Sequence, residues 1–141
     1  MLRFFWQQKR RAGTEGGFTL IELVVVLAIL GILLALAVPR YLGARKRAYK
    51  AEADNILQEA KTLSWAYYQE YSQFPSAIGD ISLVMPGGTA WTTPTIGAGG
   101  GSASSIRWDM SGLSGGAPVE PGDVCSVTLN NDGSSTQGCN F

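Results

Sequence analysis

Hydrophobic and polar residues divide the chain into a long apolar run, an amphipathic stretch and a glycine-rich remainder. The apolar run covers residues 18–38, in which Glu22 is the one charged side chain and the last sixteen residues carry no charge. A helix of this length is sufficient to cross the hydrocarbon core of a bilayer. The run therefore predicts a transmembrane helix. Its carboxylate is a candidate functional group, because a charge within a membrane is costly.

The helical pattern continues after the apolar run, with a different periodicity. Apolar residues recur every three or four positions, as on one face of an amphipathic helix. Phe74-Pro75 marks the expected end, because the residue before a proline disfavours helical backbone. We therefore expect one helix from Phe18 to about Ser72, roughly 80 Å long, whose second half carries a small domain on this face. The apolar face comprises Tyr49, Ala53, Ile56, Ala60, Leu63, Tyr67, Tyr71 and Phe74.

The composition changes after Pro75, since thirteen of the 18 glycines lie beyond residue 78. Short apolar-containing runs bounded by glycine and proline are typical of strands in a small antiparallel sheet. The clearest hairpin has arms at residues 124–129 and 134–139, joined by a turn at 130–133 whose residues tolerate positive φ. Residues 98–105 are expected to form an exposed loop. The predicted fold class is α+β, with about three or four strands packed on the second half of the helix.

Cys125 and Cys139 are the only cysteines, and they lie on opposite arms of this hairpin. A disulfide between them would place the C-terminal part in an oxidising compartment. Closing a loop of this size would add about 3 kcal/mol of stability. The alternative of half a metal site is weak, because the chain has no histidine and no third cysteine. We expect no metal and no cofactor.

Charge and residue types argue against catalysis and nucleic-acid binding. The chain has 11 basic and 11 acidic residues, and residues 18–141 hold seven and ten of them. A mildly acidic chain gives no electrostatic case for nucleic-acid binding. Three tryptophans, with Arg107, could stack on single-stranded DNA, but burial of these rings in a small core is the favoured interpretation. Without histidine, conventional Ser-His or Cys-His chemistry is absent, so we expect no enzyme. The tryptophans are Trp65, Trp91 and Trp108.

Gly17 followed by Phe18-Thr19-Leu20-Ile21-Glu22 resembles the processing site of bacterial type IV prepilins and of the related pseudopilins of type II secretion. The resemblance implies that a prepilin peptidase cuts after Gly17 and N-methylates Phe18, which leaves 124 residues. The new amine would lie close to Glu22 of the same or a neighbouring subunit. Two unit charges about 4 Å apart gain on the order of 4 kcal/mol at an effective dielectric near 20. In the family, this pairing is thought to set the register of a docking subunit.

The resemblance also implies a domain organisation and a location. Residues 1–17 would be a leader, 18–39 a membrane and assembly helix, 40–74 its amphipathic half, and 75–141 a β domain with a C-terminal disulfide loop. The subunit would wait in the inner membrane, engage the pilus assembly machinery there, and polymerise into a homo-oligomeric helical filament on the cell surface. Gly31 and Pro39 would mark a helix break, kinked in the monomer and locally unwound in the polymer.

Other interpretations of these residues stay open. Thr19-x-x-Glu22 is a capping-box pattern, which is compatible with a role in assembly. A basic leader, an apolar run and Ala35-Leu36-Ala37 are also typical of a secretory signal cleaved after Ala37. The glutamate within the run and the continuing helical pattern count against that signal. A pseudopilin of a type II secretion system would share all the N-terminal features. Membrane-tethered catalysis ranks last, because no residues are present to carry a reaction.

Two weaker site hypotheses concern the C-terminal half. Four acidic residues could supply oxygen ligands for calcium, but their spacing matches no EF-hand loop, and surface or turn roles are favoured. The glycines of residues 97–101 lack the strand-to-helix context of a phosphate-binding loop. The four acidic residues are Asp109, Glu120, Asp123 and Asp132.

Overall fold

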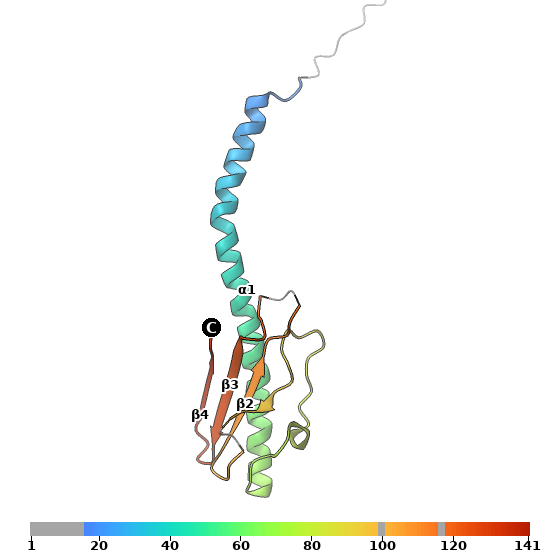
Figure 1. The fold of residues 1–141 in the computed structure, drawn as a ribbon, viewed down its shortest axis with the longest axis vertical. Helices are drawn as coiled ribbons and strands as arrows, with labels where there is room; N and C mark the ends of the chain where they lie inside the picture. Colours follow the sequence, from blue (N-terminus) through green and yellow to red (C-terminus); the bar gives the residue numbers. More distant parts are fainter. Residues whose placement is uncertain (1–15, 99–100, 116–117) are drawn as a thin grey trace, which may run out of the picture. The chain divides into compact units, whose positions relative to one another are not determined.

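The computed structural model describes residues 16–98, 101–115 and 118–141. The chain divides into two compact units, Met1–Val38 and Pro39–Phe141, which we call the N-terminal and C-terminal units. One helix, α1, runs through both, and the remaining elements belong to the C-terminal unit (Figure 1). This α+β composition confirms the predicted fold class. The elements are α1 (Leu20–Tyr71), the 3-10 helix η1 (Ile78–Ile81), β1 (Thr95–Ile96), β2 (Ser105–Ser111), β3 (Val124–Asn130) and β4 (Ser135–Cys139).

The four strands form one antiparallel sheet in the order β1-β2-β3-β4. The predicted hairpin is confirmed as β3 and β4. Its turn is closed by a hydrogen bond of 3.0 Å from the Gly133 N–H to the Asn130 carbonyl, and Gly133 has a φ of 83°. Glycine suits this position because positive φ is strained for residues with a Cβ. The register places Cys125 opposite Cys139.

The two central strands bury every second side chain, as expected for a sheet with one covered face. These side chains form a single core with the middle of α1, with η1 and with Trp91. Figure 1 shows β2 and β3 beside the C-terminal half of α1. From β2 the core receives Ile106, Trp108 and Met110, and from β3 it receives Cys125, Val127 and Leu129.

The predicted apolar face of α1 is correct near its middle and wrong at its end. Tyr71 is 54% exposed, and Ser64 rather than Leu63 is fully buried. The Ser64 hydroxyl tolerates burial because it donates to the Ala60 carbonyl (2.7 Å) and accepts from the Trp108 indole N–H (2.8 Å). A pattern of apolar residues alone omits such a serine. Of the predicted face, Ala53, Ile56, Ala60 and Phe74 are buried, and Tyr49, Leu63 and Tyr67 are half-buried.

The helix ends close to the predicted position, and an unpredicted 3-10 turn follows. Ser72, directly after α1, has a positive φ of 54°. The Asp80 carboxylate accepts hydrogen bonds from the backbone N–H groups of Ala77 (2.9 Å) and Ser76 (2.8 Å), and from the Ser76 hydroxyl (3.0 Å). These bonds lower the pKa of Asp80, because they favour the ionised form. The bond from the Ala77 N–H has the largest effect. Asp80 therefore fixes the start of η1.

The described part of the 98–105 segment confirms the expected loop. Residues 101–104 are exposed, and the Ser102 N–H donates to the Ser105 carbonyl (3.0 Å) to close a turn. Residues 99 and 100 lie outside the described residues, and with them part of the glycine run considered as a phosphate loop. Gly97 has a packing reason to be glycine, since a Cβ there would collide with the Asp109 carboxylate.

Polar side chains attach the sheet and its loops to α1 at three levels. The Trp91 indole N–H donates to the Tyr49 carbonyl (3.0 Å). The Gln137 amide donates to the Asp54 carboxylate (2.8 Å), which brings β4 against the helix. Lys46 pairs with Asp123 at 3.4 Å. None of these contacts was predicted, because each joins residues more than forty positions apart, and their pairing depends on the sheet register.

Candidate processing and assembly site

The predicted processing residues lie in an exposed, non-helical segment of the N-terminal unit. Gly16, Gly17 and Phe18 precede α1, and all three are exposed, with Phe18 91% exposed. A Cβ placed on Gly17 would meet no other atom within 4 Å. Exposed, irregular chain is the usual site of proteolytic cleavage. The geometry is thus compatible with cutting at Gly17, while the cut itself stays a prediction.

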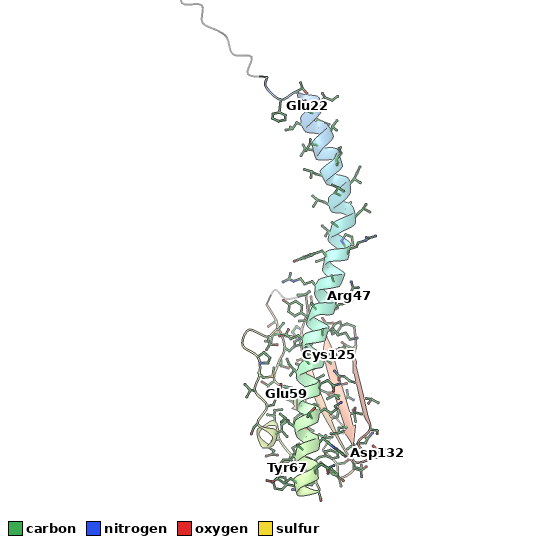
Figure 2. All side chains as sticks on the ribbon, turned by 180° about the vertical axis from the view of Figure 1, so that it is seen from behind. Glu22, Arg47, Glu59, Tyr67, Cys125 and Asp132 are labelled. Atoms are coloured by element: carbon green, nitrogen blue, oxygen red, sulfur yellow. A yellow bond between two sulfur atoms is a disulfide. The ribbon has the colours of Figure 1, made fainter. Side chains whose placement is uncertain are left out.

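Thr19 and Glu22 form a reciprocal capping box at the start of α1. Glu22 Oε2 accepts hydrogen bonds from the Thr19 N–H (2.8 Å) and from the Thr19 hydroxyl (2.7 Å). The Glu22 N–H in turn donates to the Thr19 hydroxyl oxygen (3.3 Å). Figure 2 shows Glu22 at this first turn of the helix. Two backbone donors that the helix leaves unpaired are thereby satisfied.

The capping box uses only one oxygen of the carboxylate. Both Thr19 donors converge on Glu22 Oε2, and within the described residues Oε1 accepts no hydrogen bond. An ionised carboxylate offers about four lone-pair sites on two oxygens. A cationic donor could therefore bind Oε1 without breaking the hydrogen bonds between Glu22 Oε2 and Thr19. Capping and charge pairing are geometrically compatible roles for Glu22.

The apolar residues of α1 in the N-terminal unit are not packed against any other part of the described chain. From Leu20 to Val38 every side chain is exposed, and the large ones are 48–80% exposed. α1 is the helix in the described chain that is long and apolar enough to cross a membrane, by length and composition. An apolar surface of this extent marks a lipid-facing or protein-facing surface.

Phe18 and Glu22 line the same surface depression. It is an open pocket of about 410 Å³ whose other walls are Ile21, Val25 and Val26. The polar group of this wall is the carboxylate, and the rest is aliphatic or aromatic. The pocket therefore offers a partner one negative charge on an apolar surface, next to the residue at which the mature chain is predicted to begin.

Gly31 and Pro39 lie apart from this pocket, inside α1. The helix continues through both positions from Leu20 to Tyr71. Pro39 has no N–H to donate to the carbonyl four residues earlier, so one helical hydrogen bond is missing there. A loss of helix between the two residues was predicted for the polymer, and it stays a prediction.

The predicted disulfide is present in the C-terminal unit. Cys125 of β3 and Cys139 of β4 are bonded, and they are direct cross-strand partners. Cys125 is fully buried, so the bond closes the core at the edge of the sheet. It links the two arms of the terminal hairpin, as the sequence pattern predicted.

The four carboxylates considered for calcium are separated or engaged elsewhere. Asp109 pairs with Arg107 (2.7 Å), and Asp123 pairs with Lys46. The hydroxyl and backbone N–H of Ser134 hydrogen-bond Asp132 and lower the pKa of that carboxyl. Across the described residues, no group of three or more metal-binding side chains comes together. These contacts fit the structural interpretation of the four residues.

The tryptophans are core residues rather than a stacking platform. Trp91 and Trp108 are 1% and 0% exposed, so a nucleic-acid base has no access to their faces. Trp65 is half-buried and stacks on Tyr68, with ring centroids 5.6 Å apart. Their burial agrees with the interpretation favoured from sequence.

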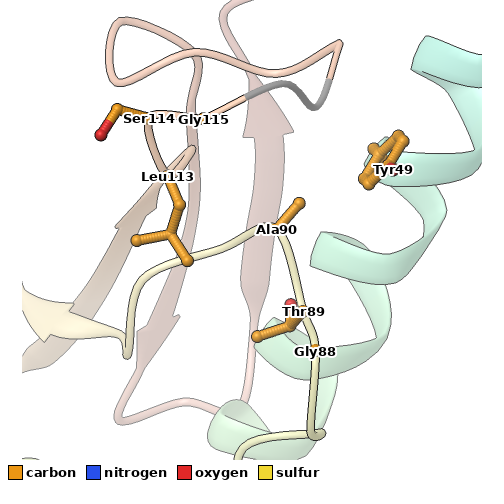
Figure 3. Close-up of a pocket in the computed structure, with 7 residues that line it drawn as sticks. All are labelled: Tyr49, Gly88, Thr89, Ala90, Leu113, Ser114 and Gly115. Carbon is orange, nitrogen blue, oxygen red and sulfur yellow. The ribbon is translucent and has the colours of Figure 1, made fainter.

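An open pocket of about 380 Å³ lies between α1 and two loops of the C-terminal unit (Figure 3). Its polar groups are the Tyr49 phenol and the hydroxyls of Thr89 and Ser114. Among the described residues, no acid, base or pair of groups suited to catalysis lines it. The remaining walls are Gly88, Ala90, Leu113 and Gly115.

Comparison with known proteins finds one matching family model and several similar proteins. Residues 14–38 match the family model of the prokaryotic N-terminal methylation motif. A type IV major pilin protein, PilA, of Myxococcus xanthus is 41% identical over 66 residues, 45% of this chain and 30% of its own length. A fimbrial protein of Neisseria meningitidis is 43% identical over 62 residues, 44% of this chain and 36% of its own.

A third relative matches over a slightly longer stretch. The type IV major pilin protein PilE1 of Neisseria gonorrhoeae is 42% identical over 72 residues, which is 51% of this chain and 44% of its own length. The chain thus spans less than half the length of each of these three relatives. The matched family model contains Gly17, Phe18 and Glu22, and it ends one residue before Pro39. By this motif and by these relatives, the chain is similar to type IV pilins.

Proposed function

We propose that this protein is a structural subunit of a type IV pilus, which polymerises through α1 after residues 1–17 are removed. The observation that carries the proposal is the position of Glu22. It is the one charge in residues 18–38, four residues after Phe18, at the head of the apolar part of α1, whose side chains are exposed from Leu20 to Val38. The pilin and fimbrial names of the relatives support a structural role rather than catalysis.

Cleavage after Gly17 would supply the counterion that Glu22 lacks. The new amine of Phe18 carries a positive charge, and Oε1 of Glu22 is free to accept from it within the described chain. In an apolar surrounding, an unpaired carboxylate is strongly disfavoured, so a subunit would dock where an amine meets a carboxylate. The pairing would select one axial register among the many that an apolar helix surface allows.

The apolar part of α1 would serve in two locations. Before assembly it would hold the subunit in the inner membrane, where the prepilin peptidase and the assembly machinery act. In the filament the same side chains would be buried among neighbouring helices, and about 25 cal/mol is gained per Å² of apolar surface kept from water. The filament would then be stable after it leaves the membrane.

The other interpretations predict different products. A secretory signal cleaved after Ala37 would release a domain that begins at Val38, and the helical conformation of residues 35–37 within α1 gives no support to that cut. A pseudopilin would be processed in the same way as a pilin but would build a secretion machine. The major-pilin names of the relatives favour the pilus.

Electron microscopy of filaments sheared from cells tests the proposal, with the subunit identified by mass spectrometry. We expect abundant thin surface filaments in which this chain is the main component, with its N-terminus at Phe18. Cells that lack this chain are the control and should lose those filaments. Filaments of normal abundance without this chain, or this chain recovered only as soluble monomer, would contradict the proposal.

A further inference from the structure

A cluster of basic residues follows the apolar segment of α1. Between Glu22 and Glu52 the chain has no acidic residue, and all its charges in that stretch are basic. They occupy the eleven residues 40–50, which begin two positions after Val38, the last residue of the apolar run. The five basic residues are Arg40, Arg45, Lys46, Arg47 and Lys50.

Within the described residues, Lys46 is the one member of this cluster that forms a salt bridge. Lys46 binds Asp123 (3.4 Å) and lies over the Phe141 ring, 4.6 Å from its centroid. No salt bridge in the described residues engages the other four, and Arg40, Arg45 and Arg47 are exposed. Figure 2 shows Arg47 on α1. Arg45 lies over the Tyr49 ring, 5.9 Å from its centroid. Within the described residues the three guanidinium groups thus have no anionic partner.

These three arginines do not share one face of the helix. At about 100° per residue, Arg40 and Arg47 lie on one side of α1, and Arg45 lies about 140–160° away from them. A protein partner that packs on a helix usually contacts one side. The headgroups of a bilayer, in contrast, surround a helix that emerges from the membrane. The arrangement of charge favours the lipid.

Neighbouring residues have the chemistry of a membrane interface. Tyr41 and Leu42 are 64% and 53% exposed, directly after Arg40. Tyrosine is enriched where a transmembrane helix meets the headgroups, because its ring is apolar and its hydroxyl polar. Exposed apolar surface would thus continue for about one turn past Pro39, mixed with the first arginine.

The distances along α1 bring the three arginines within reach of the headgroups. At 1.5 Å per residue they lie about 3, 10 and 13 Å beyond Val38. The headgroup region adds about 5–8 Å to each side of the hydrocarbon, long arginine side chains reach back toward it, and charges act over a Debye length of about 8 Å. Lys61, about 34 Å beyond Val38 by the same measure, is out of reach.

We propose that Arg40, Arg45 and Arg47 bind the anionic headgroups of phospholipids while α1 is in the membrane. This inference rests on the membrane-held stage of the proposed function. A guanidinium group donates two parallel hydrogen bonds to a phosphate, which strengthens the contact beyond simple charge attraction. The cluster would hold the emerging helix at a fixed depth in the bilayer.

Lipid selectivity of the full chain in vesicles tests this binding. The chain is reconstituted in phosphatidylcholine vesicles that contain spin-labelled phosphatidylglycerol or spin-labelled phosphatidylcholine, and the immobilised fraction of each is measured by electron paramagnetic resonance. We expect phosphatidylglycerol to be preferred about fivefold, the factor that one cation near an anionic surface supplies. Salt at 1 M should remove most of the preference.

Three variants test whether the arginines cause the preference for phosphatidylglycerol. The triple change Arg40→Gln, Arg45→Gln and Arg47→Gln should reduce the preference to about one. The matching triple change to lysine should retain most of it, because the charge remains. Lys61→Gln removes a distant cation and should leave the preference unchanged.

Any of the following results would overturn the inference. An inserted chain with no preference for phosphatidylglycerol, or a preference unaffected by the triple glutamine change, would contradict headgroup binding and leave the proposed function intact. If the triple change lowers filament yield while lipid selectivity is unaltered, the arginines serve contacts between subunits instead. A chain that immobilises neither lipid has not inserted, and the membrane-held stage of the proposed function would fail as well.

Discussion

At the residue scale, Glu22 combines a local role with a proposed intermolecular one. Its Oε2 closes the capping box with Thr19, and its Oε1 has no partner within the described chain. Capping requires a side chain of this length that can accept a hydrogen bond, and glutamine also satisfies that requirement. Pairing with an amine requires negative charge. The two roles therefore respond differently to substitution.

Replacing Glu22 tests which role matters in assembly. Glu22→Ala removes both cap and charge, and Glu22→Gln keeps an acceptor for the cap but removes the charge. We expect both variants to be cleaved after Gly17, and both to give much less filament than the wild type, as measured by immunoblots of precursor and of sheared filaments. Normal yield with Glu22→Gln would assign the residue to capping, and normal yield with Glu22→Ala would remove it from assembly.

Replacing Ser64 tests how much the buried hydrogen bond between its hydroxyl and Trp108 contributes to stability. Ser64→Ala leaves the buried Trp108 N–H without an acceptor, which costs about 1–3 kcal/mol of unfolding free energy. Thr62→Ala is a matched control, because the exposed Thr62 hydroxyl makes the same contact with a carbonyl four residues earlier (2.8 Å) and should change stability by less than about 0.5 kcal/mol. Denaturation of the detergent-solubilised chain, followed by circular dichroism, compares them. Equal losses would contradict the assigned bond.

At the element scale, the terminal hairpin depends on its disulfide and on its sheet register. Replacing both Cys125 and Cys139 with alanine removes the cross-link between β3 and β4. We expect the unfolding free energy to fall by about 2–4 kcal/mol, while the sheet persists at 25 °C because the buried side chains of β2 and β3 remain. Denaturation with and without reductant measures the effect. Wild type should lose stability under reductant, and the double variant should not respond.

η1 depends on ionised Asp80, and this makes its stability sensitive to acid. The pKa of Asp80 is lowered in the folded chain, so its contribution is present above the ordinary value of about 3.9 and is lost as pH falls through the lower folded value. Asp80→Asn should reduce stability at neutral pH and flatten its decline below about pH 4.

A second acidic residue provides the control for this pH dependence. Figure 2 labels Glu59 on α1. Glu59 is exposed, and in the described residues its carboxylate forms no salt bridge. Glu59→Gln therefore serves as the control for the loss of an acidic side chain. Thermal unfolding between pH 3 and pH 7, on the order of the range over which carboxylates titrate, measures all three chains. Identical profiles for Asp80→Asn and wild type would contradict the role of Asp80.

At the scale of the whole molecule, residue spacing predicted the elements and missed most of the contacts between them. The long helix, the hairpin and the cysteine pair follow from local periodicity and turn chemistry. The apolar pattern omits Ser64, because the burial of its hydroxyl depends on the Trp108 indole of β2. It also places Tyr71 in the core, although Tyr71 is exposed at the last residue of α1. The contact between Gln137 and Asp54 depends on a register that no local pattern specifies.

The candidate site was predictable for a related reason. Gly17, Phe18 and Glu22 lie within six residues of one another, so the site they form can be predicted without knowledge of the tertiary structure. The capping box was also foreseen from the spacing of Thr19 and Glu22, and the structure contains it. The sequence does not predict that Oε1 has no partner in the described chain, because this depends on which carboxylate oxygen Thr19 binds.

Assembly through α1 is tested by the exact mass of the N-terminal peptide of the protein isolated from native filaments. We expect a chain that begins at Phe18 and carries one methyl group on its amine. A chain that begins at Met1 would show that no counterion for Glu22 is ever made. A chain that begins at Val38 would show that the apolar helix is discarded as a signal, and either result would contradict assembly through α1.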